Sequence, residues 1–172
     1  MKLSLILFSI ICLLGCYDKP DNRFYTEDGR FKVSLPTNPV VKNVIVNSNY
    51  GNILFSTYFS KKSETEKYYA SSSVYDYSVK NNEDKKLLLE NSKNYLLNQF
   101  EIDITEERDT VINQYFGNIF RASGSNFFIE ILQLIDNNRV FQVGIMKNDV
   151  APSEKDFLDL INSFEIVKPI YR

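Results

Sequence analysis

Two stretches of the chain repeat apolar positions with the period of an amphipathic helix. Asn82 is the expected N-cap of the first, and Glu83 and Asp84 are favourably placed in its first turn. Ser153 is the expected cap of the second, with Asp156 as its capping-box partner. The sequence therefore predicts a long helix over 82–100 and a shorter one after Ser153. Their inward positions are Leu88, Leu89, Ser92, Tyr95, Leu96 and Phe100 in the first helix, and Phe157, Leu160, Ile161 and Phe164 in the second.

Most of the remaining chain alternates with the period of two that is typical of β-strands. An Asp28-Gly29 turn predicts a hairpin between Phe24-Tyr25 and the alternating residues 31–35, which Pro36 closes. Segment 127–136 is apolar on both alternating faces, so we expect it to be a central strand covered on both sides. The pattern predicts an α+β fold in which helices cover an antiparallel sheet. Further strands are predicted at 40–47, 53–60, 67–79, 102–114, 118–124 and 139–147.

The first residues follow a third pattern, in which an apolar run from Leu3 to Leu14 comes after a short basic start. This run is too short to cross a bilayer as a helix, which takes roughly 20 residues. The sequence Leu-Leu-Gly-Cys, ending at Cys16, resembles the bacterial lipobox. The resemblance implies cleavage before Cys16, a thioether-linked lipid on its sulfur and acylation of the new amino terminus. The alternative is an ordinary cleaved signal in which the cysteine occurs by chance.

These features predict three segments: a lipoprotein signal peptide over 1–15, the lipidated Cys16 with a polar tether over 16–23, and a single domain over 24–172. Two or three acyl chains hold a protein on a membrane far more firmly than one. We therefore expect the domain to be anchored through Cys16 to a membrane of the bacterial cell envelope. Cys12 leaves with the signal peptide, so no disulfide is expected within the mature chain.

Composition excludes several kinds of chemistry. The chain has no histidine, which removes imidazole general bases and histidine-ligated metals. Its glycines are never clustered as a phosphate-binding loop requires. Its formal net charge of −2 argues against nucleic acid as a partner. We therefore predict no metal and no cofactor and assign no catalytic residue, while carboxylate chemistry, or a Ser/Lys pair brought together only in space, stays open.

The order of the predicted elements resembles the PsbP-like superfamily, which includes DcrB-type lipoproteins and Mog-type proteins. The resemblance is carried by the early "DGRFKVSLP" strand ending in Pro36, the long central helix, the aromatic strand "RVFQVGIMK" and the closing "INSFEIV", and it covers roughly residues 24 to 167. It implies a three-layer α/β/α sandwich with a mostly antiparallel central sheet flanked by two helices. It also implies non-enzymatic roles in binding or assembly.

A tyrosine-rich strand is the best candidate for a binding site. Alternation places Tyr69, Tyr75 and Tyr77 on one face of segment 67–79, and Tyr58 lies near the end of the preceding strand. Exposed aromatic rings with hydroxyl neighbours would suit a protein or glycan partner. The alternative is that the tyrosines are core residues, because tyrosine favours strands.

Two acidic segments are weaker candidates for chemical sites. In "EIDITEERD", simple alternation places Glu101, Asp103, Glu107 and Asp109 on one face, where paired carboxylates could act as acid and base if they were about 5 to 9.5 Å apart in a cleft. A solvated face is the alternative reading. Segment 136–138, Asp-Asn-Asn, lacks the glycine and glutamate of a calcium loop and is interpreted as a hairpin turn.

The sequence therefore favours a membrane-anchored, non-catalytic binding or assembly module of the envelope. An adaptor or immunity-type protein for a secreted effector stays open as an alternative, and so does a carboxylate-based hydrolase.

Overall fold

The computed structural model describes residues 21–168, and in this part of the chain it contains two helices and ten strands. The predicted signal peptide, Cys16 and the start of the tether lie outside the described residues. Seven strands form the main sheet: β3 Val40–Ser48, β4 Gly51–Lys61, β5 Glu66–Tyr75, β6 Asp103–Ile112, β7 Tyr115–Ser123, β8 Phe127–Asp136 and β9 Arg139–Asn148.

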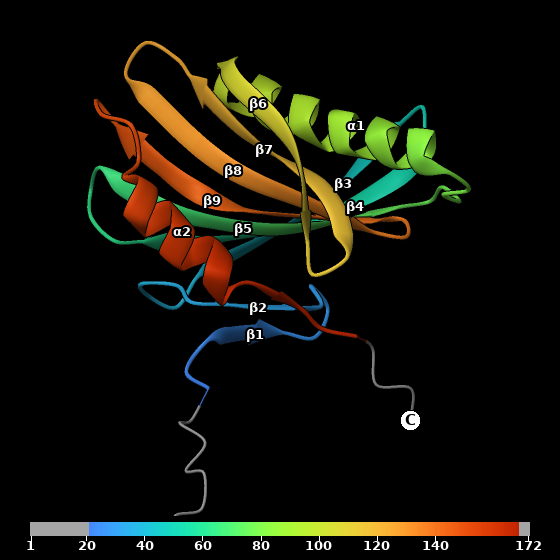
Figure 1. Cartoon of the computed structure of the whole chain (residues 1–172), viewed down its shortest axis with the longest axis horizontal. Coiled ribbons are helices and arrows are strands. Elements are labelled where there is room, and N and C mark those ends of the chain that lie inside the picture. The colour runs from blue at the N-terminus through green and yellow to red at the C-terminus, as the bar shows by residue number, and fades with distance from the viewer. Residues whose placement is uncertain (1–20, 169–172) are drawn as a thin grey trace, which may run out of the picture.

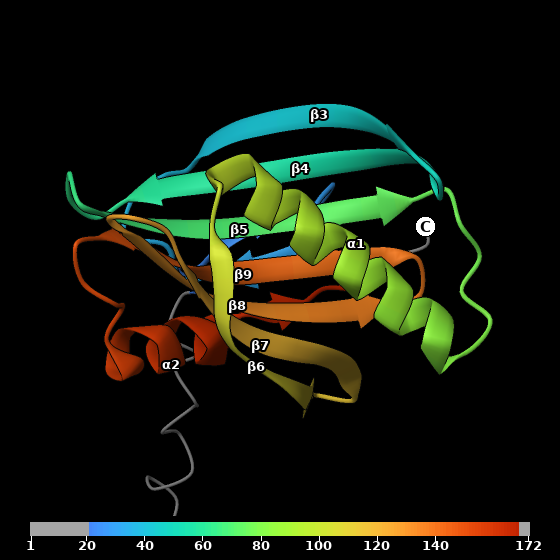
Figure 2. The ribbon, with the colours of Figure 1, turned by 90° about the horizontal axis from the view of Figure 1, so that it is seen from above.

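The main sheet is antiparallel throughout, with the order β3-β4-β5-β9-β8-β7-β6. The chain first builds β3 to β5 by successive turns, and helix α1, Asn82–Phe100, then crosses the sheet (Figure 2). Strands β6 to β9 return inward from the far edge until β9 pairs with β5. The two edges of the sheet are consequently β3 and β6.

The two faces of the main sheet have different covers (Figure 1). Helix α1 lies on one face, against β7, β8 and β9. The other face carries helix α2, Glu154–Ser163, and a small antiparallel sheet of three strands. That small sheet has the order β1-β2-β10, with β1 Phe24–Thr26, β2 Phe31–Val33 and β10 Glu165–Ile166.

The predicted three-layer α/β/α sandwich is therefore wrong. The described chain is mostly β, and a second sheet shares one face of the main sheet with α2. The physical reason is width: seven strands spaced by about 4.8 Å span roughly 29 Å, whereas a helix with its side chains is about 10 Å across. One short helix cannot cover such a face, and the hairpin of β1 and β2 fills the remaining space.

Several local predictions are confirmed. Helix α1 has the predicted bounds, although its N-cap is Asn81, whose side chain and that of Asp84 form a capping box. The side chain of Ser153 caps α2 by accepting a hydrogen bond from the Asp156 backbone N–H. Strand β8 has the predicted bounds and lies between β7 and β9. Its Ile131 belongs to the core beneath α1 and its Leu132 to the core beneath α2, so both faces are covered.

Candidate functional site

The tyrosine-rich strand does not present its rings to solvent. Tyr69 is 4% exposed and Tyr75 is fully buried, and both pack beneath α1. Tyr58 is also 4% exposed, but it lies on the opposite face of the sheet, where it packs against Phe31. Tyr77 follows the end of β5, and its hydroxyl donates a hydrogen bond to Asp84. The four tyrosines thus do not form one surface.

The hydroxyls of the buried tyrosines have partners inside the protein. Tyr69 donates to Oε1 of Gln142 at 2.7 Å, and Tyr75 contacts the backbone carbonyl of Leu88 at 3.3 Å. Burial raises the pKa of both phenols, because the charged form would lose its hydration. Tyr58, Tyr69 and Tyr75 therefore do not offer the exposed rings that the partner-binding hypothesis requires.

The acidic stretch is divided between the two faces of β6. A β-bulge between Ile104 and Glu106 shifts the alternation, so Asp103 and Glu107 point to opposite faces. Glu101 lies outside the strand and caps the end of α1. The prediction of four carboxylates on one face is wrong, because simple alternation ignores the bulge.

Segment 136–138 is a hairpin turn between β8 and β9, as interpreted from the sequence. Asn137 takes the left-handed conformation with φ of 55°, which asparagine tolerates well. Within residues 21–168 there is no group of three or more acidic, cysteine or histidine side chains arranged to ligate a metal ion.

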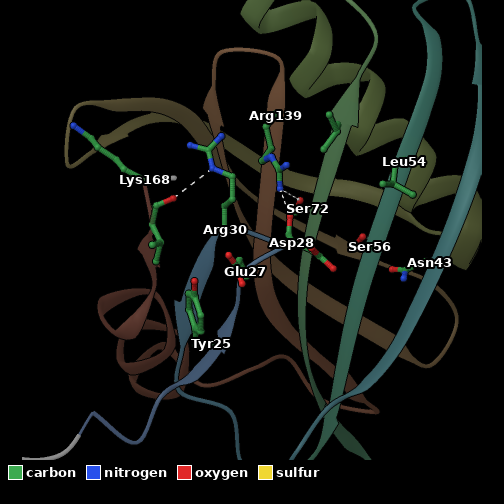
Figure 3. Close-up of a pocket in the computed structure, with 12 residues that line it drawn as sticks. Tyr25, Glu27, Asp28, Arg30, Asn43, Leu54, Ser56, Ser72, Arg139 and Lys168 are labelled. Atoms are coloured by element: carbon green, nitrogen blue, oxygen red, sulfur yellow. Dashed lines mark hydrogen bonds between the residues drawn. The ribbon is translucent and has the colours of Figure 1, made fainter. Parts of the chain in front are cut away.

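An open groove of about 560 Å³ lies between the β1–β2 hairpin and the main sheet. Figure 3 shows the side chains that converge on it. One wall is the hairpin and the chain after β10, and the other wall is formed by β3, β4, β5 and the start of β9. The lining residues are Tyr25, Glu27, Asp28, Arg30, Asn43, Leu54, Ser56, Ser72, Val74, Arg139, Val167 and Lys168.

Arg139 is the central polar residue of this groove. Its Nη1 donates to the backbone carbonyl of Asp28 at 2.6 Å and to Oγ of Ser72 at 3.0 Å (Figure 3). These two contacts fix the half-buried guanidinium between the hairpin and β5. Among residues 21–168, no carboxylate lies within 4.0 Å of Arg139 to neutralise its charge.

Two physical effects act against the charge on Arg139. Burial and, secondly, the nearby guanidinium of Arg30 lower the pKa of Arg139, and the more distant carboxylates of Asp136 and Asp28 offset this only in part. An arginine remains protonated even so. An anion that enters the groove would relieve both effects, because it would supply the missing opposite charge.

Arg30 holds the adjoining part of the groove together. Its Nη2 pairs with Asp136 at 3.2 Å, and its Nε donates to the carbonyl of Val167 at 3.4 Å. Arg30 has a φ of 60°, a left-handed conformation that favours glycine and costs other residues roughly 1–2 kcal/mol. An arginine in this conformation at the edge of a groove is a local feature that can mark a functional position.

The groove is amphipathic. Leu54, Val74 and Val167 give it apolar surface beside the cation of Arg139, and the phenol of Tyr25 stands at its edge. A suitable ligand would thus combine an anionic group with an apolar part.

Sequence reasoning missed this groove. Arg139 is a single arginine at the start of a strand, and no motif marks it. Its neighbour Asp28 is distant in sequence and comes close only because the hairpin packs on the main sheet. The sequence predicts the Asp28-Gly29 turn, but its place beside β9 depends on the tertiary structure.

Two other depressions in the described part of the chain are less suited to binding a charged ligand. One depression is next to the groove and shares the lining residues Arg30 and Lys168 with it, but Arg30 is already paired with Asp136. The other lies near Lys62, which is paired with Glu66 and Asp156. The lack of a carboxylate partner distinguishes Arg139 from these cations.

Comparison with known proteins gives little further information. No protein-family model and no curated protein matches the chain. A crystal structure from Bacteroides thetaiotaomicron VPI-5482 is similar to it with a TM-score of 0.43 and 10% sequence identity. The similarity covers 85% of this chain and 48% of that one, so this chain spans about half its length. That likeness carries no argument about fold or function, and the PsbP-like resemblance stays a prediction.

A search of the described helices for a membrane-spanning segment found none of sufficient length and apolarity.

Proposed function

We propose that this protein is a non-catalytic binding module, anchored to a membrane of the bacterial cell envelope through Cys16, that holds a carboxylate of a protein or glycan partner in the Arg139 groove. The observation that carries the binding proposal is the half-buried guanidinium without a carboxylate partner. The anchoring part rests on the lipobox resemblance of residues 13–16.

Carboxylate is the anion that fits this site best. A guanidinium is a planar fork whose N–H groups match the two oxygens of a carboxylate. In Arg139, Nη1 is engaged by Asp28 and Ser72, while no hydrogen-bond partner of Nη2 or Nε is found among residues 21–168. The apolar wall at Leu54 and Val74 would receive the carbon skeleton next to the carboxylate.

The binding test compares two arginine variants of the full chain in detergent. Peptides with a free C-terminal carboxylate and oligosaccharides containing uronate are the two probe pools, and amidated peptides and neutral oligosaccharides are their controls. Arg139→Gln should weaken capture of carboxylate probes by about tenfold to a hundredfold, because a hydrogen bond to a charged group contributes about 1.5–3 kcal/mol.

Arg108→Gln is the matched control, since Arg108 is an exposed arginine on the distant strand β6. It should capture the probes as the natural chain does. Equal capture by all three proteins, or equal capture of amidated and free peptides, would exclude Arg139 as the recognition residue. The probe pool whose capture is weakened by Arg139→Gln identifies the partner as a peptide or a glycan.

A further inference from the structure

The two edges of the main sheet are protected very differently. Edge strand β6 has five charged residues in the segment 103–109 and a β-bulge, both of which discourage pairing with another strand. Edge strand β3 is regular over nine residues and has a single charge, Lys42. Within the described residues, β3 pairs only with β4.

Three apolar side chains of β3 are exposed, and they are divided between the two faces of the sheet. Val40 is 73% exposed on the face of α1, and Val41 and Ile45 are 50% and 70% exposed on the face of the small sheet. A long, regular and apolar edge is a template for pairing with another strand. Lys42 alone does not break that pattern.

We infer that β3 pairs with β3 of a second copy of this chain, in antiparallel orientation, so that the two main sheets join into one. The sequence of β3 is self-complementary in one register, centred on Asn43. There Val41 faces Ile45 of the partner copy and Val40 faces Val46, so the exposed apolar side chains cover one another. Lys42 faces Val44, so no like charges are opposed.

The symmetry of this pairing fits the position of the groove. Antiparallel pairing of identical edges needs a two-fold axis perpendicular to the sheet, which keeps the same face of both copies on the same side. The groove residue Asn43 would lie on the axis. The grooves of the two copies would therefore lie next to each other, on either side of the paired β3 strands.

The same symmetry fits attachment to one membrane. The described chain begins at Asp21 and enters β1 on the small-sheet side of the molecule (Figure 1). A two-fold axis perpendicular to the sheet directs both chain starts to that side. This agreement depends on the proposed anchor, whereas the argument from the edges does not.

Cysteine crosslinking of the full chain in cell membranes tests the pairing. Asn43→Cys should give a disulfide-linked dimer on mild oxidation, because Asn43 meets its own copy on the axis. Asn47→Cys on the same strand is the control, since eight residues, roughly 27 Å, would separate the two copies of that position. The unsubstituted chain reports any crosslink through its own cysteines. Equal crosslinking at positions 43 and 47 would overturn the register.

The mass of the detergent-solubilised full chain gives a second readout. The natural chain should have twice the mass of one copy, and Ile45→Lys should reduce it to a single copy with an unchanged circular dichroism spectrum. Val111→Lys, at an exposed valine of β6, should remain dimeric. A monomeric natural chain, or a dimeric Ile45→Lys variant, would overturn the proposal. The Cys16→Ser variant should also have twice the mass of one copy. This result would separate a failure of pairing from a failure of anchoring.

Discussion

At the scale of single residues, Tyr69 and Arg139 show how context decides the role of a side chain. Tyr69 occurs in a strand rich in tyrosine and serine, a composition that suits a binding surface as well as a core. Burial under α1 makes it a core residue with an internal hydrogen bond to Gln142. Arg139 comes directly before a run of seven buried residues in β9, yet its guanidinium faces an open groove.

The raised pKa of Tyr69 predicts a loss of stability at alkaline pH. The folded pKa of Tyr69 lies above its ordinary value of 10.0. The neutral phenol therefore contributes its full share of the folding free energy below pH 10, and this share is lost as the pH rises further. Each buried phenol of this kind can steepen the decline in the free energy of unfolding by at most about 1.4 kcal/mol per pH unit. Tyr69→Phe should lower stability by about 1 kcal/mol at pH 7, where a hydrogen bond is lost.

The same variant should show a shallower decline above pH 10, because one ionisable group has been removed. Urea midpoints measured from pH 7 to 11 provide the comparison. Tyr25→Phe, at a tyrosine that is about half exposed, is the control and should keep the urea midpoint of the natural chain at pH 7. An identical slope in Tyr69→Phe would show that the phenol ionises without resistance and is not buried.

At the scale of elements, helix α1 is attached to the sheet by polar as well as apolar contacts. Lys93 is 4% exposed, and its Nζ bonds both carboxylate oxygens of Glu107 on β6, at 2.7 and 2.8 Å. Burial opposes the charge on Lys93, but the hydrogen bonds that its ammonium donates to Glu107 and Glu90 outweigh this effect and raise the pKa of Lys93. Asn118 also donates to Glu107. The pair thus connects the helix to the edge of the sheet.

Removing one partner of this pair should destabilise the protein more than removing both. Lys93→Met leaves Glu107 without its cation and should lower the free energy of unfolding by about 1–3 kcal/mol. The double variant Lys93→Met/Glu107→Leu should recover part of that loss, because an apolar pair of similar volume can replace a buried ion pair, whereas the buried amide of Asn118 loses its acceptor. Chemical denaturation of the four proteins of this cycle gives the coupling energy.

Lys86 and Asp109 provide an internal control for the cycle. They link the same helix and strand, but they are exposed and 4.0 Å apart. Lys86→Met should change stability by less than about 0.5 kcal/mol. Strictly additive effects of Lys93→Met and Glu107→Leu would contradict the attachment role.

The elements also show what the sequence could predict. The bounds of α1 and β8 follow from local periodicity and capping, which act over a few residues. The β-bulge after Ile104 and the separate sheet of β1, β2 and β10 depend on packing between distant segments. The groove belongs to that second kind of feature, because Asp28 meets Arg139 only in the folded chain.

At the scale of the whole molecule, the proposed function combines a membrane anchor at Cys16 with the Arg139 groove of the folded domain. Cys16→Ser should abolish incorporation of labelled palmitate and release the protein from the membrane fraction, because the lipid is the proposed attachment. The folded domain should be unaffected. Unchanged membrane partition of the Cys16→Ser variant would reject the anchor and leave the groove proposal standing.

NMR of the Arg139 guanidinium can show whether this side chain receives a carboxylate. The Nε–Hε signal of Arg139 in the detergent-solubilised full chain can be assigned by its absence in Arg139→Gln. A captured peptide with a free C-terminal carboxylate should shift this signal saturably, while its amidated form should not. The signal of Arg108 should stay in place in both titrations. Saturable shifts elsewhere in the protein, with the Arg139 signal unmoved, would show that the carboxylate binds at another site.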